Sequence, residues 1–346
     1  ERNFGDVLTG QTTEQQIRSL GDILDADVDN SGSVQLAVRE DVQRVARFLL
    51  GDNEGSVVVM EPDTGAVRAM WTNPSYDPNT FVNDEFEQAR ETLVELQRDP
   101  ENPLLAKSYQ DRFMPGSTFK VITTGIALEN GTLTTESVFP DETEWVPPQT
   151  NDPIRNYNGT TCGGDLPEVF RRSCNIPFAK VAIDMGPEEF VAGTQAWGID
   201  QRIPFDLPMG AESTIGDVAD LDQELPLLGI RGFGQSEVQM VPLHMAMVAS
   251  AVANDGVMMR PYAVETPYDH DGRVLDRTQP QEWKTPLSPR NAEILTQMMI
   301  GVVESGTASC CLDLAGGVQA AAKTGTAELG LADDPDLVHA WIIAFA

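Results

Sequence analysis

A serine followed three residues later by a lysine is the first feature of this 346-residue sequence that suggests chemistry. The stretch "MPGSTFK" places Ser117 and Lys120 at the start of an apolar helical pattern, directly after a Pro-Gly break. Residues three apart on a helix lie on the same face, one turn from each other. A serine hydroxyl is a weak nucleophile that needs a base within hydrogen-bond reach, and a neutral lysine amine is such a base. Four letters recur by chance in many proteins, so the pair alone does not exclude an ordinary surface lysine.

Two more short motifs follow Ser117 along the chain. The segment "SCN" contains Ser173 and Asn175, just before a predicted helix. The segment "KTGT" begins at Lys323, on a predicted strand near the end of the sequence. The order S-x-x-K, S-x-N, K-T-G is typical of penicillin-recognising serine enzymes. Each motif is a weak signal by itself, but the three in this order are a strong one.

The motif chemistry requires a lysine that can accept a proton. A free lysine titrates at about 10.4, so Lys120 must have a lowered pKa to be neutral. Burial and a second nearby cation both lower the pKa of a lysine, and Lys323 is the candidate cation. Ser117 is expected at the N-terminus of a helix, where backbone N–H groups and the helix dipole favour developing negative charge.

The sequence resembles the transpeptidase domain of class B penicillin-binding proteins, and most closely the penicillin-binding protein A type of actinobacterial cell walls. The resemblance covers nearly the whole chain and includes "EPDTGAVRAM", "NPLLAKSYQDRFMPGSTFKVITT", "RRSCNIPFAK" and "AAAKTGTAEL". One departure is Cys174, which stands in the middle of the second motif where aspartate is common in relatives.

The resemblance implies a D,D-transpeptidase that cross-links peptidoglycan stem peptides and is a target of β-lactams. Ser117 would take the acyl group from the D-Ala-D-Ala end of a donor peptide and pass it to an amine of a neighbouring peptide. Ser173 would relay a proton to the leaving amine, and Asn175 would hold the substrate amide and Lys120. The backbone N–H groups of Ser117 and Thr326 would form the oxyanion hole. The expected substrate-binding residues are those of the third motif, Thr324, Gly325 and Thr326, with the charge of Lys323 beside them.

The resemblance also carries expectations about organisation and partners. Residues 1–35 are expected to be a remnant of an N-terminal pedestal or linker, and residues 36–346 the transpeptidase domain. The last strand and C-terminal helix of the domain, the rest of the pedestal and a membrane anchor would lie outside this sequence. We expect action at the extracytoplasmic face of the cell membrane, with a membrane glycan polymerase as partner of the N-terminal part. No cofactor and no metal ion are expected.

Composition limits the other possible partners and covalent links. The chain has 54 acidic and 23 basic residues, a formal charge of −31. A surface this acidic repels phosphate backbones, so nucleic acid is not an expected partner. Cys162 and Cys174 have two alternatives, a disulfide or buried thiols, and the adjacent Cys310 and Cys311 are not expected to form an ordinary bridge.

The order of elements predicts an α+β fold. Strands come first, helices fill the middle and strands return, which favours a mostly antiparallel sheet flanked by helices, with a helical subdomain carrying the first two motifs. A hairpin is predicted over 55–74 and two strands over 317–346. Helices are predicted near 38–50, 83–99, 116–131, 177–186, 241–256 and 288–306.

Other functional classes remain as alternatives within the same superfamily. A D,D-carboxypeptidase or a serine β-lactamase would use the same serine, and a non-catalytic β-lactam sensor would keep it for signalling. The sequence between the second and third motifs contains no convincing glutamate loop for β-lactam hydrolysis. A Ser-His-Asp hydrolase is disfavoured because Ser117 lacks the G-x-S-x-G context, and His244 is expected to be a hydrogen-bonded core residue.

Overall fold

The computed structural model describes residues 4–12, 15, 31–81, 86–219, 221–312, 314–329 and 337–346. The chain divides into two compact units. The first unit comprises Glu1–Asp111, Pro204–Ala211 and Arg260–Gln281, and the second comprises Arg112–Ile203, Glu212–Met259 and Glu282–Ala346. All three motifs belong to the second unit. No helix of the described ranges is long and apolar enough to cross a membrane.

The first unit is built around a β-hairpin that the sequence predicts. Strands β2 (Gly55–Met60) and β3 (Val67–Asn73) pair antiparallel, and Gly65 adopts a φ of 81° in the turn between them. Helix α3 (Glu40–Leu50) packs on this hairpin and ends at Gly51, also as predicted. The other elements of the unit are α1 (Gly5–Leu8), β1 (Ser33–Leu36), η1 (Pro78–Phe81), α4 (Phe86–Arg98), α5 (Lys107–Gln110) and β9 (Val264–Tyr268), which pairs with β1.

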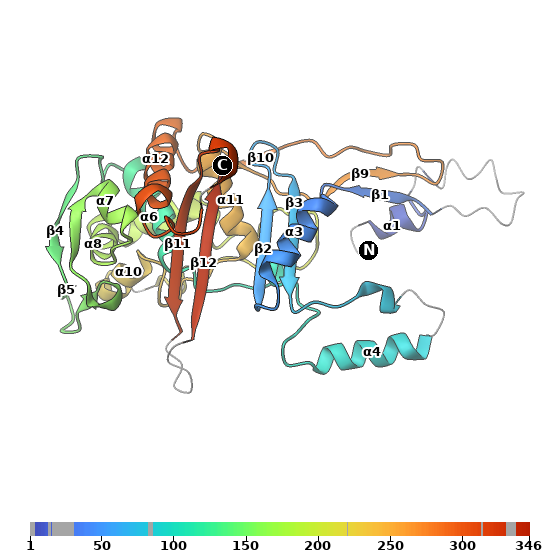
Figure 1. The fold of residues 1–346 in the computed structure, drawn as a ribbon, viewed down its shortest axis with the longest axis horizontal. Helices are drawn as coiled ribbons and strands as arrows, with labels where there is room; N and C mark the ends of the chain where they lie inside the picture. The colour runs from blue at the N-terminus through green and yellow to red at the C-terminus, as the bar shows by residue number, and fades with distance from the viewer. Residues whose placement is uncertain are drawn as a thin grey trace, which may run out of the picture. The chain divides into compact units, whose positions relative to one another are not determined.

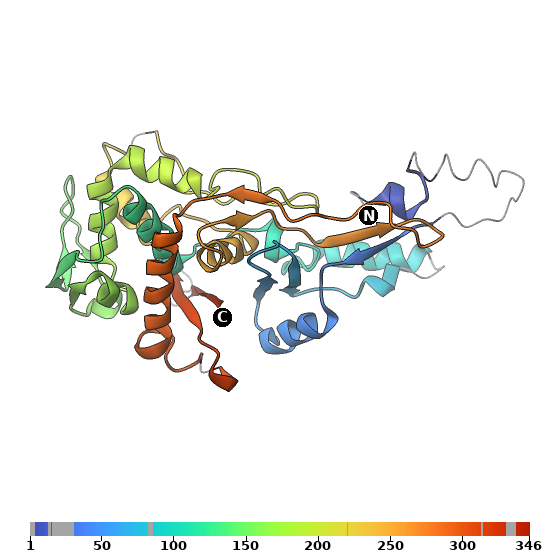
Figure 2. The same cartoon turned by 90° about the horizontal axis from the view of Figure 1, so that it is seen from above.

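The second unit combines a two-stranded ribbon with buried helices. Strands β11 (Ala321–Glu328) and β12 (Val338–Phe345) pair antiparallel over their whole length. Helix α12 (Pro289–Ser305) runs beside this ribbon in both views (Figure 1; Figure 2). Helices α6 (Lys120–Glu129) and α11 (Pro242–Ala253) bury most of their side chains because both are apolar on nearly all faces. A helix of this kind is stable only in the interior of a domain.

The remaining elements of the second unit are η2 (Gly116–Phe119), β4 (Val138–Glu142), β5 (Glu144–Trp145), β6 (Ile154–Arg155), η3 (Tyr157–Gly159), β7 (Cys162–Asp165), α7 (Leu166–Arg171), α8 (Ile176–Met185), α9 (Pro187–Ala196), α10 (Leu225–Arg231), β8 (Met258–Met259), β10 (Glu282–Lys284) and η4 (Ala315–Gly317). Each pairing between described strands is antiparallel. The predicted α+β fold and the helical region around the first two motifs are therefore confirmed.

The cysteines differ in part from the expectation. Cys162 and Cys174 form a disulfide, which selects one of the two alternatives and ties β7 to the second motif. Cys310 and Cys311 are also joined, so the prediction that these neighbours do not pair is wrong. Adjacent side chains diverge on an extended strand, but these two residues lie in a turn after α12.

Glycines allow the first motif to approach the third closely. Gly116 has a φ of 52°, and a Cβ there would lie 2.5 Å from the carbonyl oxygen of Thr326. A Cβ on Gly325 would lie 2.5 Å from the carbonyl oxygen of Pro115 and 2.9 Å from the amide nitrogen of Thr118. Distances this short are repulsive for any side chain. The backbone of η2 can therefore pack directly on β11, and a side chain at either glycine would push them apart.

Two glycine-to-alanine substitutions are expected to change stability in opposite directions. Gly325→Ala forces the η2–β11 contact apart and is expected to lower the free energy of unfolding by about 1–3 kcal/mol. Gly301→Ala is a matched control, because its Cβ would meet nothing closer than 3.9 Å inside α12. The control is expected to raise the free energy of unfolding by about 0.5–1 kcal/mol, since glycine weakens a helix interior. Urea unfolding of both variants measures the two changes, and equal effects would contradict the close approach.

Candidate active site

The amine of Lys120 lies at the centre of the three motifs. Its Nζ is 2.9 Å from Ser117 Oγ, 2.8 Å from the carbonyl oxygen of Ser173 and 2.8 Å from Asn175 Oδ1. The side chain is completely buried. Carbonyl and amide oxygens only accept hydrogen bonds. The two N–H groups of a neutral amine can therefore donate to these two oxygens, which leaves the nitrogen lone pair for the proton of the Ser117 hydroxyl.

A second buried lysine completes the cluster. Lys323 Nζ donates to Ser173 Oγ at 2.8 Å and to the carbonyl oxygen of Thr324 at 3.0 Å. Ser173 Oγ also lies 3.5 Å from Lys120 Nζ, so this hydroxyl stands between the two amines. The structure thus brings together all five of the predicted catalytic residues in one hydrogen-bonded cluster.

Burial dominates the electrostatics of this cluster. Loss of solvation lowers the pKa of Lys120 well below its ordinary value, and the nearby charge of Lys323 lowers it further. Burial also lowers the pKa of Lys323, to about 7. Aromatic rings form part of the surroundings: Lys120 Nζ lies 5.4 Å from the ring centre of Phe178, and Lys323 Nζ lies 5.7 Å from that of Phe170. Within the described residues, no carboxylate forms an ion pair with either amine.

The end of helix α7 shapes the second motif. Ser173 follows this helix with a φ of 61°, in the left-handed region that non-glycine residues seldom adopt. The amide of Ser173 donates to the carbonyl of Phe170, and that of Cys174 donates to the carbonyl of Val169. These bonds terminate the helix in the left-handed manner common at helix ends. The consequence is that both the carbonyl and the hydroxyl of Ser173 lie within reach of the lysine amines.

A neighbouring asparagine, which sequence reasoning missed, orients the second motif. Asn156 is almost fully buried, and its Oδ1 accepts from the amides of Asn175 at 2.8 Å and Ile176 at 3.2 Å. The Nδ2 of Asn175 donates to the carbonyl of Arg155 at 3.1 Å. Because that bond holds the amide nitrogen of Asn175, its Oδ1 faces Lys120.

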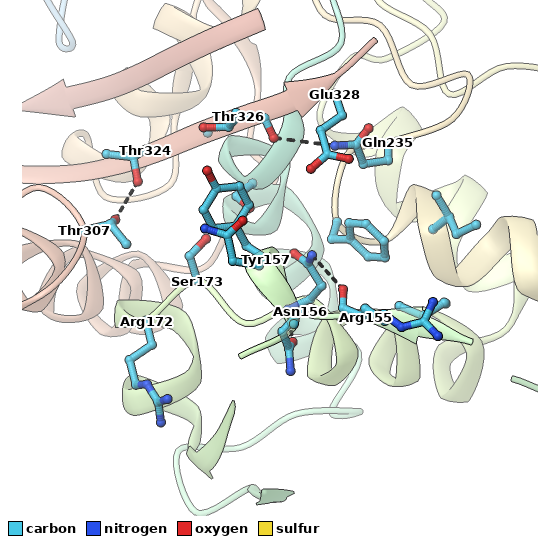
Figure 3. A pocket seen from close by; sticks show the side chains of 18 of the residues that line it. Arg155, Asn156, Tyr157, Arg172, Ser173, Gln235, Thr307, Thr324, Thr326 and Glu328 are labelled. Carbon is cyan, nitrogen blue, oxygen red and sulfur yellow. Dashed lines mark hydrogen bonds between the residues drawn. The ribbon is translucent and has the colours of Figure 1, made fainter. Parts of the chain in front are cut away.

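The cluster opens into a pocket of about 650 Å³ along the edge of β11. Thr324, Gly325 and Thr326 line this pocket together with Ser117. Among the described strands, β11 pairs only with β12, so its other edge faces the pocket. Figure 3 shows side chains of both threonines at this edge, with Ser173 across from them.

Three further residues of the pocket did not belong to the predicted set. The hydroxyls of Thr307 and Thr324 lie 2.5 Å apart, and Gln235 Nε2 lies 3.5 Å from the carbonyl oxygen of Thr326 (Figure 3). Glu328, the last residue of β11, also lines the pocket. Thr307 comes from the turn after α12 and carries no periodic signal, so only the fold reveals its contact with the third motif.

His244 is a core residue, as the sequence predicts. It is fully buried, with its ring nitrogens 2.9 Å from Ser213 Oγ and 2.9 Å from the carbonyl oxygen of Trp197. Burial lowers its pKa to about 4, so the ring is neutral near pH 7. Both nitrogens have partners far in sequence from the three motifs, and His244 is absent from the residues that line the pocket.

Comparison with known proteins agrees with the motif geometry. The sequence pattern of the family described as "Penicillin binding protein transpeptidase domain" matches residues 55–346. The chain is 34% identical to the peptidoglycan D,D-transpeptidase PbpA of Mycolicibacterium smegmatis, over 100% of this chain and 71% of that relative. It is 32% identical to penicillin-binding protein 3 of Bacillus subtilis, over 86% of this chain and 43% of that relative.

A solved structure matches the whole chain. The ceftriaxone acyl-enzyme complex of penicillin-binding protein A from M. tuberculosis superposes with a TM-score of 0.90 at 31% identity. The match covers 100% of this chain and 78% of that one. Family pattern, relatives and fold agree with the resemblance that the three motifs indicated, and the chain therefore belongs to the class B penicillin-binding protein transpeptidase family.

Proposed function

We propose that this protein is a serine D,D-transpeptidase that cross-links peptidoglycan stem peptides through an acyl-enzyme on Ser117. The observation that carries the proposal is the buried Lys120 amine, 2.9 Å from the Ser117 hydroxyl and without a carboxylate partner among the described residues. A neutral amine at this distance is a general base for the serine. The relatives named as D,D-transpeptidases and the β-lactam acyl-enzyme structures support the same chemistry.

Acylation begins with the transfer of the Ser117 proton to Lys120. The freed Ser117 oxygen attacks the carbonyl carbon of the penultimate D-Ala, and the carbonyl oxygen becomes an oxyanion. Backbone N–H groups of Ser117 and Thr326 stabilise this charge, and a single such donor contributes on the order of 100- to 1,000-fold in rate. The C–N bond then breaks, and the leaving D-Ala amine takes the proton from Lys120 through the Ser173 hydroxyl.

Deacylation repeats the steps of acylation in reverse, with the acceptor amine in place of the D-Ala that has left. The acceptor amine of a second stem peptide attacks the ester carbonyl and gives its proton to Lys120. The ester C–O bond breaks and Ser117 regains a proton, which completes the transfer of the acyl group. Asn175 contributes by holding the donor amide and the Lys120 amine in place.

The third motif recognises the C-terminal carboxylate of the donor. The hydroxyls of Thr324 and Thr326 donate to this carboxylate, and Lys323 supplies positive charge beside it. Gly325 allows the strand to approach the serine closely, so the carboxylate and the scissile carbonyl are held on one strand edge. A β-lactam carries an equivalent carboxylate and would block Ser117 as a stable ester.

The alternatives are less well supported by the site. A serine β-lactamase of the glutamate-dependent kind needs a carboxylate that activates the deacylating water. Among the described residues that line the pocket, Glu328 is the sole carboxylate, and it lies at the far end of β11 from Lys323. The glutamates of the sequence segments "GPEEF" and "GAEST" are the nearest candidates for this role, and none of them lines the pocket: Glu188, Glu189 and Glu212.

The setting of the activity follows from its substrate. Peptidoglycan is assembled outside the cytoplasm, and we propose that the protein acts at the extracytoplasmic face of the membrane with a glycan polymerase as partner. We further propose that residues 1–35 belong to a pedestal or linker and 36–346 to the transpeptidase domain. The partner and the role of residues 1–35 can be tested together. We expect capture of a polymerase by the chain that includes residues 1–35, but not by residues 36–346 alone.

The proposed nucleophile is tested by labelling with a fluorescent penicillin. We expect a stable covalent adduct in the purified protein and none in Ser117→Ala, measured by gel fluorescence and intact mass. Loss of the label within seconds would indicate a β-lactamase instead. With a stem-peptide donor, formation of a cross-linked product that rises with acceptor amine concentration distinguishes a transpeptidase from a carboxypeptidase and from a sensor.

The two lysines predict the pH dependence of acylation. Lys120 must be neutral, so the second-order rate constant falls at low pH as this amine becomes protonated. Lys323 loses its charge above about pH 7, so attraction of a substrate carboxylate is lost as the pH rises further. The acylation rate constant of a penicillin is therefore expected to fall at both low and high pH. That of its methyl ester, which has no carboxylate, is expected to fall at low pH only. An equal fall of the rate constant at high pH for the two compounds would contradict the role of Lys323.

Thr307 is proposed as a positioning residue for Thr324. If Thr324 donates its proton to the carboxylate, its oxygen is free to accept from Thr307, at the observed 2.5 Å. Thr307→Val removes this donor and is expected to slow acylation by a penicillin by about fivefold, or about 1 kcal/mol. Thr307→Ser keeps the hydroxyl and serves as the matched control with a rate near that of the wild type. A loss that is equally large for the penicillin methyl ester would indicate a structural role alone.

A further inference from the structure

Glu328 brings a negative charge to a pocket that otherwise suits an anionic substrate. It is the last residue of β11, its side chain is exposed, and it is the only carboxylate residue among the described residues that line the pocket. No ion pair joins it to a cation of the described ranges. Figure 3 shows the side chain at the Thr326 end of the pocket, together with Gln235.

The positive charges around the pocket have other partners. Arg155 pairs with Glu144 at 3.0 Å, and Arg172 lies 3.8 Å from Glu168. Lys323 lies five positions before Glu328 along the chain, and its amine donates to Ser173 Oγ. The carboxylate of Glu328 is therefore not neutralised by the protein. In a chain with a formal charge of −31, such a group would weaken the binding of any purely anionic ligand.

The register of β11 indicates which part of a ligand meets Glu328. Side chains alternate along a strand, so Thr324, Thr326 and Glu328 point to the same face. Thr324 lies four residues, or about 13 Å of strand, before Glu328, and Thr326 lies two residues before it. A donor peptide lying antiparallel on the open edge places its C-terminal carboxylate at the hydroxyls of Thr324 and Thr326, and its scissile carbonyl at the backbone N–H of Thr326. The side chain of the preceding donor residue then extends toward Glu328.

We propose that Glu328 binds a positively charged side-chain group on the donor residue that precedes the acyl residue. The preferred substrates are stem peptides with a free amine on a diamino-acid residue at this position, and β-lactams with an ammonium in the corresponding side chain. This inference rests on the proposed function, because it uses the donor orientation set by Ser117 and the third motif. The Gln235 side chain, next to the carbonyl of Thr326, borders the same subsite.

Two penicillins that differ by one amino group test the subsite. Benzylpenicillin and ampicillin share their nucleus, and ampicillin adds an ammonium next to the side-chain amide carbonyl. We expect Glu328→Gln to lower the second-order acylation constant of ampicillin by about three- to fivefold, the range of a partly exposed ion pair. The constant for benzylpenicillin is expected to stay the same or rise slightly. In about 1 M salt, where the screening length falls to about 3 Å, the difference is expected to shrink.

Glu91→Gln is the matched control for charge. Glu91 is exposed on α4 and is absent from the residues that line the pocket, so this variant loses the same single charge without changing the pocket lining. The ratio of the two acylation constants is expected to remain at its wild-type value. A stem-peptide donor with a free diamino-acid amine, compared with its N-acetylated form, is expected to show the same dependence on Glu328 in the cross-linking assay.

The results of these experiments distinguish failure of the cation subsite at Glu328 from failure of the proposed function. If Ser117 is labelled by both penicillins and Glu328→Gln leaves their ratio unchanged, the cation subsite is wrong while the proposed function stands. The same conclusion follows if Glu91→Gln changes the ratio as much as Glu328→Gln. If neither penicillin labels the wild-type protein, the proposed function fails and the subsite fails with it.

Discussion

The whole site depends on two lysine amines that are buried without a carboxylate. Burial of an ammonium is costly, and a nearby acid would offset that cost by stabilising the charged form. Such an acid would also raise the pKa of Lys120 and remove its ability to accept a proton. The protein instead surrounds Lys120 with neutral oxygen atoms from Ser173 and Asn175, at 2.8 Å each. The chain carries 54 acidic residues, and yet among the described residues none pairs with these amines. In the proposed mechanism, the exclusion of carboxylates is what allows Lys120 to act as a base.

The absence of a carboxylate beside Lys120 in the described part of the chain explains why segments that are distant in the sequence must meet around this amine. Neutral acceptors have to be supplied by backbone and amide groups in fixed directions, because they attract an amine less strongly than a carboxylate does. The left-handed conformation of Ser173 turns its carbonyl toward Lys120, and Asn156 orients Asn175 from behind. The disulfide from Cys174 to Cys162 links the same motif to β7. A residue held in the left-handed region costs on the order of 1 kcal/mol or more, which the surrounding bonds offset.

Sequence reasoning identified the residues of the hydrogen-bonded cluster that we propose to react, but not the residues that hold them in place. Ser117, Lys120 and Lys323 could be predicted because helix spacing, motif order and the known effect of burial on lysine constrain them directly. The hairpin of the first unit and the long helices followed from turn residues and apolar periodicity. Asn156 and Thr307 could not be predicted, since each is a polar residue of an irregular segment whose contact forms only after distant elements pack. Helix α7 has a readable signal in its capping Asp165, but at six residues it is too short for periodicity to reveal.

The charged residues of strand β11 have a further consequence for how a substrate binds. The buried Lys323 lies near the beginning of β11 and the exposed Glu328 at its end, so groups of opposite charge lie at the two ends of the strand. A donor bound in the productive direction places its carboxylate near Lys323. A donor bound in reverse would place that carboxylate beside Glu328, where repulsion between like charges disfavours it. The scissile carbonyl then reaches the Ser117 oxygen in one orientation only. In the proposed mechanism, the charges at the two ends of one strand thus select the direction of the substrate, while the neutral surroundings of Lys120 allow its amine to act as the base.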